Sequence, residues 1–132
     1  MKGFIVNIEK ATEENGKFRQ VLYTARYSQL VVMSIPPQGE IGEEVHGLDQ
    51  FLRIESGEGK TVLNGVETPI SAGFAIVVPA GTRHNFVNTS ATEDLKLYTV
   101  YAPPNHKDGT VHETKADADA HEEHFDGRTS EE

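Results

Sequence analysis

The stretch Gly73–Asn88, GFAIVVPAGTRHNFVN, decides the fold of this chain. After a glycine turn it continues as an apolar strand over 74–78 and then as a Pro-Ala-Gly turn. Pro79 cannot donate to a sheet ladder, so it marks a strand end, and Gly81 accepts a backbone conformation that most residues avoid. A new strand therefore begins at His84. The pattern predicts a histidine held at the mouth of a small β-sandwich or barrel, which is a suitable place for a metal.

Length and composition restrict the remaining possibilities. The chain has 132 residues, which corresponds to one domain with one hydrophobic core. It contains no cysteine, which excludes disulfides, thiolate zinc sites and cysteine nucleophiles. A net charge of −9 argues against nucleic acid as a partner. No apolar run is long enough to span a bilayer and the start becomes charged within a few residues, so we expect no membrane partner and a cytoplasmic location.

The acidity belongs mainly to the C-terminal part. Residues 105–132 contain nine acidic and three basic residues, whereas residues 1–104 contain twelve and nine. The final segment has few large apolar side chains, which is typical of disorder. We therefore predict a β-barrel domain over 1–104 and a short, flexible, partly disordered acidic tail over 105–132.

Short apolar runs separated by glycine, proline and asparagine turns indicate an all-β fold. Asn64-Gly65 is the strongest hairpin signal. No segment before residue 105 shows clear helical periodicity. The predicted strands cover 3–9, 19–25, 30–35, 50–55, 60–63, 66–70, 74–78, 84–88 and 95–101.

The chain resembles a single-domain cupin. The second cupin motif, G-x5-P-x-G-x2-H-x3-N, is matched at every fixed position by Gly73, Pro79, Gly81, His84 and Asn88. The first motif, G-x5-H-x-H-x3-4-E-x6-G, is matched only in part. The resemblance implies a double-stranded β-helix, also called a jelly-roll barrel.

The departures lie in the first motif. His46 occupies the position of the second histidine, Glu44 stands where the family has the first, and Gln50 stands where it has glutamate. The resemblance therefore implies that one divalent transition metal per chain is bound by His46, Gln50 and His84, with Glu44 or water completing the shell. Copper, iron, manganese, nickel and zinc all remain open.

The last strand should line the same cavity, with Tyr101 facing inward. Tyr101 and Glu44 are the candidate catalytic residues, because a phenol or a carboxylate near a metal can transfer protons. We expect His106 and His112 to be exposed loop histidines, with closure over the site as the alternative.

The resemblance implies metal-assisted isomerisation, that is keto–enol chemistry, on a small sugar or sugar acid. One alternative is a copper- or iron-dependent oxidoreductase that uses dioxygen or peroxide to cleave a saccharide. The second alternative is a non-catalytic ligand-binding cupin. The apolar strand at 74–78 needs cover on its outer side, and Phe51 points the same way, so a homodimer is expected.

Overall fold

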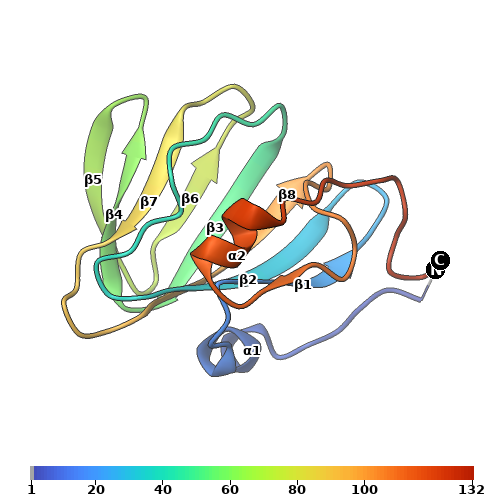
Figure 1. Cartoon of the computed structure of the whole chain (residues 1–132), viewed down its shortest axis with the longest axis horizontal. Coiled ribbons are helices and arrows are strands. Elements are labelled where there is room, and N and C mark those ends of the chain that lie inside the picture. The colour runs from blue at the N-terminus through green and yellow to red at the C-terminus, as the bar shows by residue number, and fades with distance from the viewer. Residues whose placement is uncertain (1) are drawn as a thin grey trace.

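Figure 1 shows the fold as a computed structural model that describes residues 2–132. Two antiparallel sheets face each other, a six-stranded sheet in the order β6-β3-β8-β2-β1-β9 and a three-stranded sheet in the order β5-β4-β7. The strands are β1 (Arg19–Thr24), β2 (Gln29–Ile35), β3 (Asp49–Ser56), β4 (Glu58–Leu63), β5 (Val66–Ser71), β6 (Ala75–Val78), β7 (His84–Asn88), β8 (Leu95–Ala102) and β9 (Val111–His112). The helices are α1 (Ile8–Glu14) and α2 (Lys115–Ala120). The prediction of an all-β jelly roll is confirmed.

Local sequence signals position the strands as expected. Asn64 and Gly65 both have positive φ, 49° and 83°, which is the requirement of the tight turn that joins β4 to β5. Along β8 the side chains alternate, so that Leu95, Leu97 and Thr99 are fully buried while the residues between them are half-exposed. This alternation directs one row of β8 into the space between the two sheets.

The hydrophobic core fills that space. It is built from the inward-facing rows of both sheets, and its largest fully buried members are Phe86, Met33, Ile35, Leu52 and Ile54. Close backbone packing also contributes at Gly59, where a Cβ atom would lie 2.3 Å from the carbonyl oxygen of Val87. Only glycine therefore lets β4 approach β7 this closely.

The N-terminal segment differs from the prediction. A strand over 3–9 was expected, but the chain runs irregularly to Asn7 and then forms α1. The Asn7 side chain caps this helix by accepting a hydrogen bond from the Lys10 amide at 3.1 Å. The prediction of a strand is wrong here. The alternating Phe4 and Val6 do not form a buried face, because their side chains are 44% and 40% exposed. No helix among residues 2–132 is long and apolar enough to cross a membrane.

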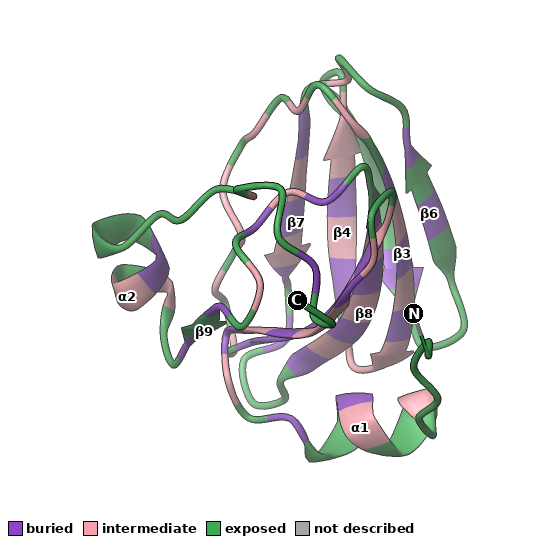
Figure 2. Cartoon of the chain, turned by 90° about the vertical axis from the view of Figure 1, so that its right-hand side faces the viewer, coloured by how far each residue is buried: buried purple, intermediate pink, exposed green. Residues whose placement is uncertain are grey.

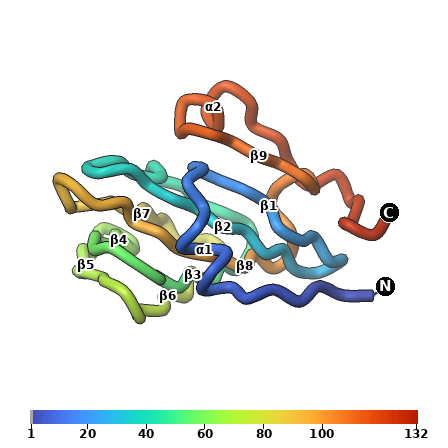
Figure 3. The backbone as a smooth tube through the Cα atoms, turned by 90° about the horizontal axis from the view of Figure 1, so that it is seen from below, coloured from blue at the N-terminus to red at the C-terminus, as the bar shows by residue number. Residues whose placement is uncertain are grey.

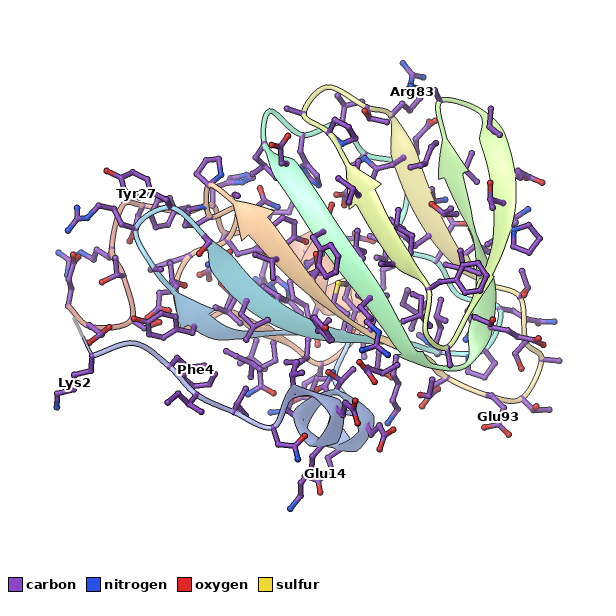
Figure 4. All side chains as sticks on the ribbon, turned by 180° about the vertical axis from the view of Figure 1, so that it is seen from behind. Lys2, Phe4, Glu14, Tyr27, Arg83 and Glu93 are labelled. Atoms are coloured by element: carbon purple, nitrogen blue, oxygen red, sulfur yellow. The ribbon has the colours of Figure 1, made fainter. Side chains whose placement is uncertain are left out.

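The outer face of the six-stranded sheet is partly apolar. Figure 4 views this face, with α1 and the segment that carries Phe4 along its lower margin. Its edge strand β6 exposes Val77 by 63%, and Phe74 just before it by 47%. Val77 pairs with Phe51, which pairs with Val100, so an apolar row crosses three strands.

The C-terminal segment also differs from the prediction of a flexible, partly disordered tail. Residues 105–132 return along the barrel, where β9 pairs with β1 and α2 lies beside it (Figures 2 and 3). The buried side chain of Gln29 fixes the start of this segment: its Oε1 accepts from the amides of Asn105 and His106, and its Nε2 donates to the His106 carbonyl at 2.7 Å. Polar contacts of this kind are invisible to a prediction based on apolar content.

Candidate metal centre

Glu44, His46 and His84 converge at one end of the barrel. Each offers one ligand atom, and these atoms all lie within 4.8 Å of one another. Backbone contacts bring the two cupin motifs together here: the amides and carbonyls of Glu44 and His84 exchange two hydrogen bonds of 2.9 Å. The Gly81 amide also donates to the His46 carbonyl at 2.8 Å. The Pro-Ala-Gly turn therefore sets the position of His46 as well as that of His84.

His84 is held with one nitrogen facing the site. It is 3% exposed, and its Nδ1 lies 2.8 Å from the carbonyl oxygen of Thr82. A carbonyl only accepts, so Nδ1 carries a proton, and in the neutral ring Nε2 has the lone pair. A hydrogen bond from the other ring nitrogen to a carbonyl is the usual way in which proteins orient a metal-binding histidine.

His46 and Glu44 are in direct polar contact. Nε2 of His46 lies 2.6 Å from Oε2 of Glu44, and this contact lowers the pKa of the Glu44 carboxyl. The angle at the His46 nitrogen falls outside ordinary hydrogen-bond geometry. Two bare lone pairs would repel each other at this distance, so the contact requires a proton or a cation between the two atoms.

Gln50 contributes a second buried atom without a partner. Its Nε2 lies 3.1 Å from the Thr99 hydroxyl, which itself donates to the Phe51 carbonyl at 2.8 Å. Because the hydroxyl proton is already used, Thr99 must accept from the Gln50 amide group. This assigns the amide orientation and leaves Oε1, which is buried, as a free acceptor.

The charges in the site favour an ionised carboxylate beside a neutral phenol. Burial raises the pKa of Glu44, but contact with His46 and the positive charge of Arg19 outweigh it, so the pKa lies below its ordinary value. Burial raises the pKa of Tyr101 to about 12. The Tyr101 ring stands edge-on to both His46, at 6.2 Å between centroids, and His106, at 5.3 Å. Tyr101 therefore lies beside the candidate ligands as a protonated phenol.

The C-terminal segment supplies the opposite wall. A cavity of about 260 Å³ is lined by Glu44, Val45, His46, Asn105, His106, His112, Glu122, Glu123 and His124. The expectation that His106 and His112 are exposed is wrong, because they are only 9% and 5% exposed. Burial, with a contribution from the positive charge of Arg19, lowers the pKa of His106 to about 3, so it is a neutral imidazole.

Arg19 is the residue that sequence reasoning missed. It is a buried charge at the start of β1, and no motif marks it. His106 follows a Pro-Pro pair and was expected in an exposed loop, with closure over the site as the alternative. The structure agrees with the alternative, because His106 lines the cavity.

Asn88, the last residue of the second motif, has a structural role. It is 1% exposed, and its Nδ2 donates to the carbonyls of Ile35, Pro36 and Glu93 at 2.8–3.1 Å. Its Oδ1 accepts from the Ser90 amide at 2.9 Å. Asn88 thus fixes the loop between β7 and β8 at the far end of the strand from His84.

The residues present fit a divalent metal. Two imidazole nitrogens and one carboxylate oxygen, from His46, His84 and Glu44, form a mixed donor set suited to transition metals. Oε1 of Gln50 is in addition buried without a partner, which is costly unless something binds it.

Comparison with known proteins gives the family. Residues 31–101 match the cupin domain family Cupin_2. The uncharacterised protein YrkC of Bacillus subtilis (strain 168) is 51% identical over 130 residues, which is 92% of this chain and 69% of YrkC. The uncharacterised protein L612 of Acanthamoeba polyphaga mimivirus is 39% identical over 113 residues, covering 82% of this chain and 70% of L612.

A solved structure agrees in overall shape. The crystal structure of BH2720 from Bacillus halodurans superimposes with a TM-score of 0.88 at 45% identity, and the match covers 91% of this chain and 96% of that chain. The family match spans both motifs and all the candidate ligands. This chain belongs to the cupin family, as a single-domain member.

Proposed function

We propose that this cupin is a metal-dependent enzyme that isomerises a small sugar or sugar acid by keto–enol proton transfer. The observation that carries the proposal is the convergence of Glu44, His46 and His84, whose ligand atoms all lie within 4.8 Å of one another. Gln50 would complete the donor set through its free Oε1. When bound, a divalent ion supplies a Lewis acid that polarises a carbonyl oxygen.

The protein's own groups would handle the protons. Isomerisation requires a base that removes a proton from the carbon beside a carbonyl and an acid that returns a proton to the neighbouring carbon, with no oxidant consumed. Tyr101, with a pKa of about 12, is a proton donor that stays protonated at neutral pH. Glu44, whose lowered pKa keeps it ionised, would be the base that takes the proton from one carbon and returns it to the neighbouring carbon.

Oxidative chemistry is the second candidate. Glu44, His46 and His84 form a set of two histidines and one carboxylate, the donor combination of many iron enzymes that activate dioxygen. A copper or iron ion held there could support oxidative cleavage of a saccharide with dioxygen or peroxide as the oxidant.

Metal content and reaction products separate the two reactions. Elemental analysis by inductively coupled plasma mass spectrometry should find close to one transition-metal ion per chain in protein purified without added metal. Exchange of a carbon-bound sugar proton for deuterium in heavy water, without oxygen consumption, supports the isomerase. Oxygen uptake in the presence of a saccharide supports the oxidoreductase. Stable binding of a sugar with neither reaction would assign the chain to the non-catalytic cupins.

A further inference from the structure

Arg19 is a buried cation at the inner end of the site. It is 7% exposed and lies on β1, where it pairs with Met33 of β2 on one side and His112 of β9 on the other. Its guanidinium carbon sits 5.3 Å from the centre of the Phe18 ring. Its Nη1 donates to Nδ1 of His112 at 3.3 Å, and its hydrogen-bond contact with Tyr101 offsets part of the rise in the pKa of that phenol.

His112 does not neutralise this charge. Its Nε2 lies 3.0 Å from the carbonyl oxygen of His121, which can only accept, so Nε2 carries the proton and Nδ1 is the acceptor for Arg19. The imidazole is therefore neutral. Among residues 2–132, no carboxylate lies within 4.0 Å of the Arg19 side-chain nitrogens. Its Nε is buried with no partner at all.

A buried guanidinium without a carboxylate is energetically unfavourable. Moving a charge out of water costs several kcal/mol unless an opposite charge and hydrogen bonds compensate. The direct partners of Arg19 are neutral and its Nε donor is unused, so only the more distant charge of Glu44 offsets this cost. The unused donor is the group that a ligand acid would satisfy.

The charge lies next to the candidate metal centre. His112, its hydrogen-bond partner, lines the same cavity as Glu44, His46 and His106. Arg19 does not itself line the cavity, but its hydrogen bond to His112 puts the guanidinium directly beside a residue of the cavity wall. Its positive charge also lowers the pKa of Glu44 and of His106.

We propose that Arg19 binds a carboxylate of the ligand, so that the cavity takes an acid rather than a neutral sugar. Planar guanidinium and carboxylate groups match each other in a two-bond geometry that lysine cannot reproduce. This inference rests on the proposed function for the reaction. It narrows the substrate, because it selects the sugar acid over the neutral sugar.

The charge count of the site agrees with this assignment. The charges of Glu44 and Arg19 cancel each other, so a bound divalent ion would leave the site with two net positive charges. An anionic ligand would offset these charges. Glu122 and Glu123 also line the cavity, but both are exposed. Water and salt screen their charges far more than the charge of the buried Arg19.

The test compares D-glucuronate with its uncharged amide, D-glucuronamide, and with acetate as a minimal carboxylate. Binding is measured by calorimetry in metal-loaded protein and in protein treated with chelator, because a carboxylate can also bind a metal. Arg19→Met removes the charge and Arg19→Lys keeps it without the planar fork. Arg83→Met, at an exposed arginine, is the matched control.

In chelated wild-type protein, we expect glucuronate to bind about 10- to 100-fold more tightly than glucuronamide. Arg19→Met should remove this preference, Arg19→Lys should reduce it, and Arg83→Met should leave it intact. Equal binding of the acid and its amide by wild-type protein, or no binding of either carboxylate at millimolar concentration, would overturn the proposal without any variant. Arg19-dependent binding in a protein that takes up no metal would instead refute the proposed function and leave this inference standing.

Discussion

Nε2 of His46 lies 2.6 Å from Oε2 of Glu44, which is the distance of a charge-assisted contact and lowers the pKa of that carboxyl. The ligand atom of His84 lies within 4.8 Å of both, and Nδ1 of the His84 ring lies 2.8 Å from the Thr82 carbonyl oxygen. The two cupin motifs, which lie far apart in the sequence, thus contribute donors to one point.

Replacing His84 tests this convergence directly. His84→Ala should remove most of the bound metal, since it deletes a buried ligand whose orientation is already set. His121→Ala, at an exposed histidine of the C-terminal segment, is the control. The measurement is metal content per chain after gel filtration. Retention of full occupancy by His84→Ala would show that the assigned site is wrong.

Gln50 should be a weaker ligand than the histidines. Gln50→Ala is expected to lower metal affinity less than His84→Ala does, because a neutral amide oxygen donates little charge. Gln50→Glu restores an acid at the position where the family has one, and should tighten binding by about tenfold or more. Competition with a coloured chelator gives both affinities. Identical affinities for wild type and both variants would place Gln50 outside the metal shell.

Gln29 should hold the C-terminal segment on the barrel. Gln29→Ala removes four hydrogen bonds, three of them buried, and leaves the amides of Asn105 and His106 without partners. We expect a loss of about 2–4 kcal/mol in the free energy of unfolding. Hydrogen exchange at residues 105–112 should accelerate, whereas Gln20→Ala on the neighbouring strand should leave it unchanged. Unaltered exchange in Gln29→Ala would mean that other contacts hold the segment.

His106 should make stability depend on pH. Its pKa is about 3 in the folded protein and about 6.5 in the unfolded chain. Between these values only the unfolded chain binds the proton, so the free energy of unfolding should fall as the pH drops below about 6.5, by about 1.4 kcal/mol per pH unit for this group.

His106→Asn should remove that contribution. Urea unfolding in chelator at pH 7.5 and pH 5 should show a stability difference about 2 kcal/mol smaller in the variant than in wild type. His121→Asn should behave like wild type, because that side chain is exposed. A wild-type pH dependence in His106→Asn would show that this imidazole titrates normally.

The apolar row on the outer face predicts a homodimer. Val77 is 63% exposed on the edge strand β6 and pairs with Phe51 of β3. An exposed apolar row of this kind is typical of an interface between subunits. Wild-type protein should sediment at twice the chain mass of 14.5 kDa at micromolar concentration. Val77→Asp should yield monomers, whereas Val66→Asp on the other sheet, 65% exposed, should not. A monomeric wild-type protein would contradict the prediction.

Much of the barrel could be predicted because its signals are local. Alternation along β8, the Asn64-Gly65 turn and the Pro79–Gly81 turn each depend on residues a few positions apart. The same locality explains the error at the N-terminus, where three alternating apolar residues favoured a strand although Asn7 caps a helix. Too few residues were involved for the pattern to decide between the two.

The sequence by itself determined the cupin barrel and singled out His46 and His84, because the spacing of glycine, proline and histidine follows the cupin motifs. Only the tertiary structure decided what surrounds them. Arg19 meets His112 across 93 residues of chain, and Gln29 meets His106 across 77. Such contacts depend on which strands become neighbours, and on buried polar partners that composition does not reveal.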